Sequence, residues 1–151
     1  MRAIVCRDWG DPEKLELGEL PEPALGPGQV RIRMRAAGVN FADCVLVRGQ
    51  YQEKPELPFA PGLEGAGEIM EVGDGVSDFK PGDRVMAVVS AGAYAEQAVC
   101  EATTVFHTPD GMDDITAAAF PVAYGTSHLA LVHRAQLKAG ETVLVLGAGG
   151  G

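Results

Sequence analysis

The sequence predicts a mainly β fold with α+β elements: a mostly antiparallel, partly open β-barrel, followed by the first helix and strand of a truncated α/β domain. Three observations support this prediction. The 151 residues include 20 Gly and 10 Pro, so turns are frequent and most elements should be short strands. Apolar and polar residues alternate in the early segments, which is typical of half-buried strands. Beyond Gly111 the apolar spacing becomes helical and then continuous.

Strands are predicted over residues 1–6, 14–20 and 29–37, and the third shows the clearest alternation. One of its faces is apolar and the other carries three arginines, in the order Val30, Arg31, Ile32, Arg33, Met34, Arg35. The arginines could bind an anionic ligand or partner. A solvated strand face is the ordinary result of half-burial, however, and it is the interpretation favoured here.

A short helix is predicted between Asn40 and Arg48, with Asn40 as its N-cap and Gly49 as its stop. The chain then passes through a proline-rich loop and returns to strands. These are predicted over residues 65–72, 84–89, 93–99 and 104–107. Together with the first three strands they make up the predicted β-domain.

After a turn at residues 109–111, the chain is predicted to leave the β-domain through two helices. The first is capped by Asp113 or Asp114 and runs through residues 117–119; the second spans residues 124–134, after Pro121. Residues 142–146, TVLVL, form a nearly continuous apolar run. Such a run is typical of a central parallel strand covered on both faces.

A glycine-rich turn, GAGGG at residues 147–151, follows this strand directly. Gly147 and Gly149 fit the first two positions of Gly-x-Gly-x-x-Gly. With Gly150, they are expected to let backbone N–H groups approach the pyrophosphate of a dinucleotide. We therefore expect the chain to stop inside the turn that opens a nucleotide-binding domain. A flexible glycine tail is the alternative, but it does not explain the strand before it.

Composition excludes several classes of partner. The net charge of -9 leaves no basic surface for nucleic acid or an anionic membrane. No stretch approaches the ~18 apolar residues of a membrane span, so no membrane insertion is expected. The three cysteines, Cys6, Cys44 and Cys100, are widely spaced and odd in number, which argues against a disulfide framework or a Cys-x-x-Cys metal site. A cytoplasmic location is expected.

Four ordered blocks carry the most specific signal. The central block is PGLEGAGEIMEVG at residues 61–73, and KPGDRV follows at residues 80–85. With AGVNFAD at residues 37–43 and PVAYGT at residues 121–126, they resemble the medium-chain dehydrogenase/reductase family. This resemblance implies a GroES-like catalytic domain over residues 1–122 and the beginning of a truncated Rossmann NAD(P)-binding domain over residues 123–151.

Zinc-dependent members of this family carry a Cys where Asn40 stands and a His where Leu63 stands. Neither an amide nor an isobutyl group can replace a thiolate or an imidazole on zinc. The segment after Val85 also lacks the clustered cysteines of the family's structural zinc lobe. The resemblance therefore implies a zinc-free member, with no metal ligands.

Among zinc-free members, GVNFAD, Tyr51 and EGAG are similar to NADPH-dependent quinone oxidoreductases and their vesicle-associated relatives. This implies hydride transfer from NADPH, or alternatively NADH, to a quinone or an α,β-unsaturated carbonyl. The implied catalytic residues are Asn40, Tyr51 and Thr126, and Asn40, Ala42 and Thr126 are implied to contact the cofactor. The chain alone is expected to be inactive, and the full-length protein is expected to be a homodimer.

Each of these residues also has a plainer interpretation. Asn40 either offers an amide donor to the substrate or caps the following helix, and both roles can coexist. Tyr51 either donates to a developing enolate or is an aromatic residue on the rim. Thr126 either lies near the nicotinamide or is an ordinary helix residue. Glu64 is interpreted as a buried structural carboxylate, and Asp43 either orients a donor or closes a turn.

The remaining candidates add little. Several bacterial quinone reductases have a tyrosine where Val45 stands, which leaves the substrate class open. His128 and His133 are five residues apart, hence about 140° apart around an α-helix, and do not form the i, i+4 pair that metal sites use. His107 lies near a strand end, and surface or core placement is expected for all three histidines.

Two other enzyme classes and one binding class stay open. An enoyl-thioester reductase would need a basic entrance for CoA phosphates, which the acidic balance disfavours. A zinc-family alcohol dehydrogenase relative is the other enzymatic alternative. A non-catalytic GroES-like binding or scaffold module, including a co-chaperonin, is the alternative from a different class, because a fold does not fix a function.

Overall fold

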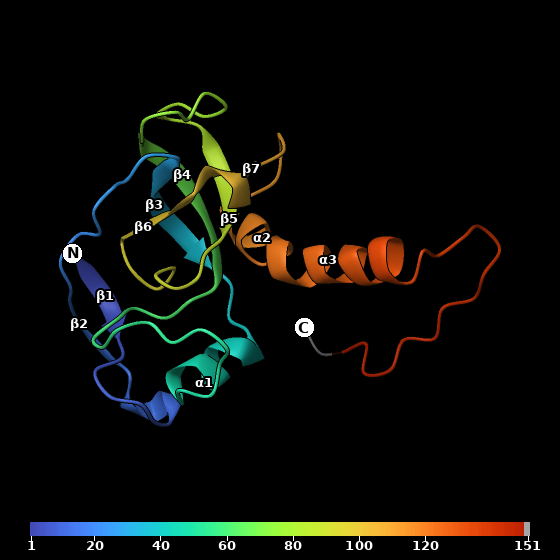
Figure 1. Ribbon diagram of the computed structural model, residues 1–151, viewed down its shortest axis with the longest axis horizontal. Coiled ribbons are helices and arrows are strands. Elements are labelled where there is room, and N and C mark those ends of the chain that lie inside the picture. Colours follow the sequence, from blue (N-terminus) through green and yellow to red (C-terminus); the bar gives the residue numbers. More distant parts are fainter. Residues whose placement is uncertain (150–151) are drawn as a thin grey trace.

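The computed structural model describes residues 1–149, which form two antiparallel sheets and a helical exit (Figure 1). The small sheet pairs β1 (Arg2–Val5) with β2 (Glu16–Glu19). The large sheet has five strands in the order β6-β3-β4-β5-β7. Its strands are β3 (Gln29–Ala37), β4 (Glu64–Val72), β5 (Arg84–Val88), β6 (Gln97–Glu101) and β7 (Val105–His107). The mainly β prediction is confirmed, and both sheets are open.

Strand β3 lies inside the large sheet, where it pairs with both β4 and β6. Its alternation is confirmed: Val30 and Ile32 are fully buried, whereas Arg33 and Arg35 are exposed. Arg31 is half-buried, and its Nε donates to Glu71 of the neighbouring strand at 3.2 Å. The arginine face is thus a solvated face balanced by acidic residues across the ladder.

The main core lies between the strands of the large sheet and the segments that cross it. It consists of apolar side chains from all five strands and from the loop after β5, namely Val30, Ile32, Ile69, Val85, Ala87, Val89, Ala93, Cys100 and Val105. A second cluster lies under α1 (Phe41–Val47) and includes Cys6, Leu46, Val47, Phe59 and Leu63. Through this second cluster, α1 packs against the loop before β4. Asn40, at the start of α1, therefore lies near the start of β4.

Short helical elements punctuate the β-domain and then lead out of it. The 3₁₀ turns η1 (Pro12–Lys14) and η2 (Ala102–Thr104) precede β2 and β7. Helix α2 (Asp114–Ala118) is capped by Asp113, whose side chain accepts a 2.8 Å hydrogen bond from the Thr116 N–H. Its Ala117 and Ala118 pack against Ala66 and Met86, so the exit is anchored on β4 and β5.

Helix α3 (Phe120–His128) continues as a π-helix, η3 (Leu129–Arg134), and extends away from the sheets (Figure 1). The sequence predicted a start at residue 124, after Pro121. The helix begins earlier because proline is tolerated in the first helical turn, where its missing N–H has no intrahelical partner. Within residues 1–149, none of the helices has the length and apolar character needed to cross a bilayer.

Two predicted strands differ from the structure. Residues 93–96 form a turn, and β6 begins only at Gln97. Residues 142–146 form no strand, and Leu144 and Leu146 are 82% and 85% exposed. A strand is stabilised by a ladder with a neighbour, and none of the strands described here pairs with this segment. Its apolar run therefore lies exposed on the extended segment after η3.

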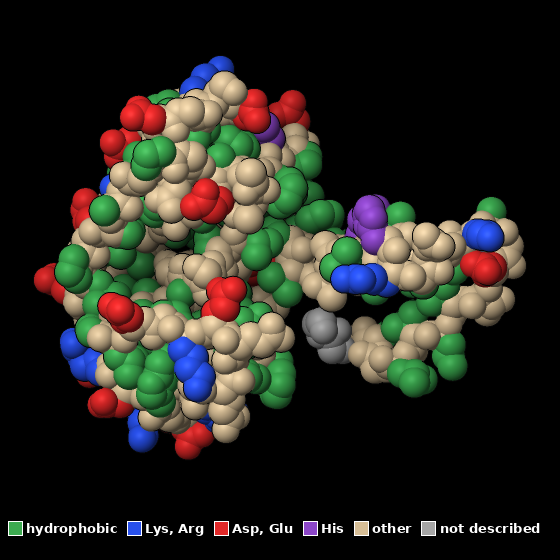
Figure 2. All heavy atoms as spheres, viewed as in Figure 1, with side chains coloured by type: hydrophobic (Ala, Val, Ile, Leu, Met, Phe, Trp, Pro, Cys, Tyr) green, Lys and Arg blue, Asp and Glu red, His purple; other side chains and the backbone are tan. Residues whose placement is uncertain are grey.

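The visible surface of the β-domain carries scattered acidic side chains with fewer basic ones (Figure 2). Several basic residues are paired with carboxylates, as in Arg2–Glu96, Arg48–Asp11 and Arg84–Asp114. These pairs are exposed and so contribute little to stability. The distribution agrees with the acidic balance of the sequence.

Candidate active site

The side chain of Asn40 is held by a buried carboxylate. Asn40 is the N-cap residue of α1, and its Nδ2 donates to Glu64 Oε1 at 2.9 Å. Because a carboxylate can only accept, this contact fixes the orientation of the amide. One Nδ2 hydrogen remains for another partner. Asn40 therefore begins the helix, as one of its two interpretations predicted, and its role as a donor to the substrate stays a prediction.

Glu64 joins two elements that are far apart in the sequence. It is the first residue of β4 and is 2% exposed. While Oε1 accepts from Asn40, Oε2 accepts a 2.8 Å hydrogen bond from the Val122 N–H in the first turn of α3. The positive end of the helix dipole also favours a carboxylate at this position. Glu64 is thus a structural carboxylate, as predicted, and it links Asn40 to the start of α3.

A second buried carboxylate holds the backbone of Asn40. Asp43 is 5% exposed, and its Oδ2 accepts a 2.8 Å hydrogen bond from the Asn40 N–H, which closes the start of α1. The same oxygen accepts a 2.9 Å hydrogen bond from the Tyr94 hydroxyl. Asp43 Oδ1 is buried without a hydrogen-bond partner among the described residues. Burial, and then the charge of Asp43, raise the pKa of Tyr94, so the phenol stays protonated as a donor.

Two glycines leave room for these buried groups. A Cβ on Gly38 would overlap the Glu64 carboxylate, and a Cβ on Gly62 would lie 2.6 Å from the Tyr94 ring. Gly62 also has a φ of +98°, a conformation that side-chain-bearing residues rarely adopt. Gly38 and Gly62 are therefore required by the side chains of Glu64 and Tyr94.

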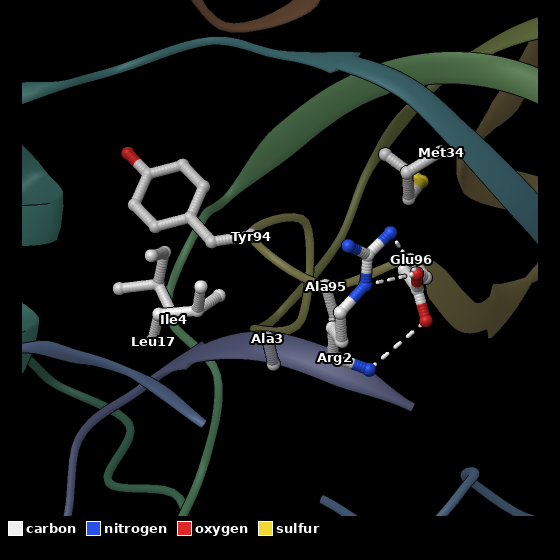
Figure 3. Close-up of a pocket in the computed structure, with 8 residues that line it drawn as sticks. All are labelled: Arg2, Ala3, Ile4, Leu17, Met34, Tyr94, Ala95 and Glu96. Atoms are coloured by element: carbon white, nitrogen blue, oxygen red, sulfur yellow. Dashed lines mark hydrogen bonds and ion pairs between the residues drawn. The ribbon is translucent and has the colours of Figure 1, made fainter. Parts of the chain in front are cut away.

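The hollow drawn in Figure 3 is not at Asn40. It is an open groove of about 290 Å³ lined by Arg2, Leu17, Met34 and Tyr94, among others, beside the Arg2–Glu96 ion pair (Figure 3). The Tyr94 hydroxyl points away from that pair (Figure 3). A smaller apolar cavity of about 90 Å³ is lined by Val39, Asp43 and Tyr94, among others. We place the candidate site at Asn40 because the buried, hydrogen-bonded polar groups converge there.

The other predicted side chains surround this network less closely. Tyr51 and Ala42 are half-buried and pack against the cluster under α1. Thr126 is exposed on α3, one turn beyond Val122. Within residues 1–149, no hydrogen bond connects Tyr51 or Thr126 to Asn40. The structure therefore brings Asn40 and Glu64 together, and the catalytic roles of Asn40, Tyr51 and Thr126 stay predictions.

The glycine-rich segment lies in the exposed region after η3. Gly147 has a φ of +73°, and a Cβ on Gly147 or Gly149 would meet no atom within 4 Å. There is thus open space beside both glycines, and the left-handed conformation of Gly147 suits a tight turn. Gly150, the third predicted cofactor-binding glycine, lies outside the described residues.

The expectation that His128 and His133 lie about 140° apart around the helix is wrong. The rings of His128 and His133 are 5.4 Å apart in an edge-to-face contact. They meet because residues 129–134 form a π-helix, in which residues five apart lie on one face. In the part of the chain that the structure describes, no three His, Cys, Asp or Glu residues are grouped so that they could hold a metal ion.

Sequence reasoning missed two groups of the site, the Tyr94 hydroxyl and the Val122 N–H. Tyr94 fell inside a predicted strand, where its side chain had no expected partner. One signal was available, because a partly buried tyrosine usually finds a hydrogen-bond partner for its hydroxyl. The Val122 N–H is a backbone group, and nothing in the side-chain pattern reveals its contact.

Comparisons with known proteins agree with this architecture. Residues 26–110 match the alcohol dehydrogenase GroES-like domain. The chain is 46% identical over 149 residues to the mouse quinone oxidoreductase-like protein 2, covering 99% of the chain and 42% of that protein. The chain thus spans less than half the length of this relative.

Two solved structures show the same fold. One is a probable oxidoreductase from Mycobacterium abscessus, with a TM-score of 0.90 and 44% identity over 100% of this chain and 48% of that one. The other is a mycobacterial protein in complex with NADPH, with a TM-score of 0.88 and 36% identity over 100% of this chain and 47% of that one. From the matched domain, the identities and the shared fold, the chain belongs to the medium-chain dehydrogenase/reductase family.

Proposed function

We propose that the full-length protein is a zinc-free, NAD(P)H-dependent reductase of quinones or α,β-unsaturated carbonyls, and that this chain supplies the substrate side of its site. The observation that carries the proposal is the hydrogen bond from Asn40 to Glu64. It places an oriented amide where zinc-dependent members carry a thiolate ligand. Residues 1–122 are proposed as the substrate-side domain, and residues 123–151 as the start of the Rossmann domain.

The residues at the two zinc-ligand positions do not fit a metal. Leu63 is 7% exposed and packs in the apolar cluster under α1. The Asn40 amide directs its nitrogen at Glu64, and an amide nitrogen is not a zinc ligand. Glu64 itself accepts two hydrogen bonds from N–H groups. The donor set is that of a hydrogen-bonding site, and the proposed chemistry proceeds without a metal.

The open glycines fit a nicotinamide dinucleotide, and one structural relative was solved with NADPH. We propose that Gly147, Gly149 and Gly150 hold its pyrophosphate, and that Asn40, Ala42 and Thr126 contact its nicotinamide end. When bound, this cofactor supplies a hydride. The remaining N–H of Asn40 then donates to the substrate oxygen as its charge grows, which is the role that a metal would otherwise fill. The Tyr51 phenol and the Thr126 hydroxyl are proposed as further hydrogen-bond donors.

The proposal includes the setting of the protein. We propose a cytoplasmic homodimer acting on small molecules. Cys6, Cys44 and Cys100 are all free thiols, which agrees with a reducing compartment. The acidic surface agrees with the absence of nucleic-acid partners.

The test uses the full-length protein with NADPH and 1,4-benzoquinone. We expect the loss of NADPH absorbance to match hydroquinone formation one to one, and a metal chelator to leave the rate unchanged. A rate that falls with the chelator and is restored by zinc would overturn the proposal that the enzyme works without zinc. A lack of turnover with quinones and enones would overturn the proposed reductase activity and favour a non-catalytic binding module.

A further inference from the structure

Tyr94 stands outside the residues that the family resemblance singles out, yet its hydroxyl reaches into the Asn40 site. It lies in the turn before β6, where its backbone N–H donates to the Pro61 carbonyl at 2.9 Å. Gly62 leaves space for its ring. The loop that precedes Glu64 therefore holds the backbone of Tyr94 and leaves space for its ring.

The hydroxyl of Tyr94 meets two acceptors, Asp43 Oδ2 at 2.9 Å and the Gly38 carbonyl at 3.2 Å. A phenol has one proton to donate, and the carboxylate is both the nearer and the stronger acceptor. Asp43 Oδ2 thus accepts from Tyr94 and from the Asn40 N–H, while Oδ1 is buried without a partner among the described residues. Tyr94 supplies one of the two hydrogen bonds that hold this carboxylate.

We infer that Tyr94 is a positioning residue of the Asn40 site and acts through Asp43. The order of contacts is Tyr94 hydroxyl, Asp43 carboxylate, Asn40 N–H. Asn40 is then fixed at two points, its backbone by Asp43 and its amide by Glu64. A donor must lie within a fraction of an ångström of the substrate oxygen to act, so loosening one hold should lower turnover. This inference rests on the catalytic role proposed for Asn40.

The test is a double-mutant cycle in the full-length protein with NADPH and benzoquinone. Tyr94→Phe removes one oxygen atom and should lower kcat roughly tenfold with little change in KM, because it disturbs positioning more than binding. If Tyr94 acts through Asn40, the same substitution should cost little in kcat when Asn40 is already Ala. Tyr124→Phe, which removes the hydroxyl of an exposed tyrosine on α3, is the matched control and should keep the original kcat.

A second measurement does not depend on activity. Tyr94→Phe should speed hydrogen exchange at the Asn40 backbone amide, whereas Tyr124→Phe should leave it unchanged. An unchanged kcat in Tyr94→Phe, or an equal loss in the Asn40→Ala background, would overturn the inference. An unchanged exchange rate of the Asn40 amide in Tyr94→Phe would also overturn the inference, whether or not the protein reduces quinones. A lack of quinone turnover in the original protein would instead contradict the proposed function.

Discussion

The Asn40 amide nitrogen lies 2.9 Å from Glu64 Oε1, and the other oxygen of the same carboxylate lies 2.8 Å from the Val122 nitrogen. One buried side chain thus fixes both the amide of the candidate site and the beginning of the helix that carries Thr126. Two distant blocks of the sequence, GVN and EGAG, are connected through this carboxylate.

Glu64→Gln tests the double role of the carboxylate. A glutamine can accept from only one of the two N–H groups, and its own NH₂ would face the other donor. We expect kcat to fall and the free energy of unfolding to fall by about 1–3 kcal/mol, since a buried donor is left unpaired. Steady-state kinetics and denaturant unfolding measure the two effects.

The matched control for Glu64→Gln is Glu101→Gln. Glu101 also accepts from a side-chain amide, that of Gln29 at 2.8 Å, but that pair is exposed and lies away from Asn40. The control should change neither kcat nor stability appreciably. Equal effects of the two substitutions would show that burial and placement of Glu64 are unimportant.

Gly38→Ala tests the close approach of Glu64 to the backbone. The added Cβ would overlap the carboxylate, which is held on both oxygens and cannot move aside freely. We expect a loss of about 1–3 kcal/mol in stability, as in other overpacked sites, together with a lower kcat. Gly125→Ala, where a Cβ meets no atom within 4 Å inside a helix, should instead keep or raise stability. Thermal unfolding measures both effects, and a Gly38→Ala variant more stable than Gly125→Ala would contradict the expected close approach of Glu64.

Cys100 gives stability a dependence on alkaline pH. Burial raises the pKa of its thiol from 9.0 to about 11. A raised pKa means that the folded state holds the proton more tightly, so this contribution is complete below about pH 9 and is lost as pH rises toward 11. Wild-type stability should therefore fall between pH 8 and pH 11 by about 2–3 kcal/mol more than that of Cys100→Ala. Denaturant unfolding of both proteins at pH 8 and pH 11 measures this difference. An equal fall in the stability of the two proteins would contradict the prediction.

The local elements could be predicted from the sequence because their signals are local. The alternation over residues 29–37 predicted β3, and Asn40 with Gly49 predicted the limits of α1. The strand predicted over residues 142–146 failed because an apolar run specifies a strand only where a neighbour pairs with it. The His128–His133 contact was missed because the π-helical geometry of η3 leaves no mark on the apolar spacing.

The candidate site was predictable in part. Asn40 and Glu64 stood out through family blocks, but their hydrogen bond joins residues 24 positions apart and depends on the packing of α1 against the loop before β4. Tyr94 and Asp43 are 51 positions apart, and only the folded chain brings them together. Single-residue patterns cannot reveal such pairs, because each partner has an ordinary local role.

The most direct test of the central claim compares kcat of the full-length protein and its Asn40→Ala variant in benzoquinone reduction by NADPH, with a chelator present throughout. Gln29→Ala, which removes another side-chain amide that donates to a carboxylate, is the control and should keep the original kcat. The account predicts that Asn40→Ala lowers kcat roughly 10²-fold, as expected for the loss of an oxyanion donor. An Asn40→Ala variant with undiminished, chelator-resistant turnover would contradict it.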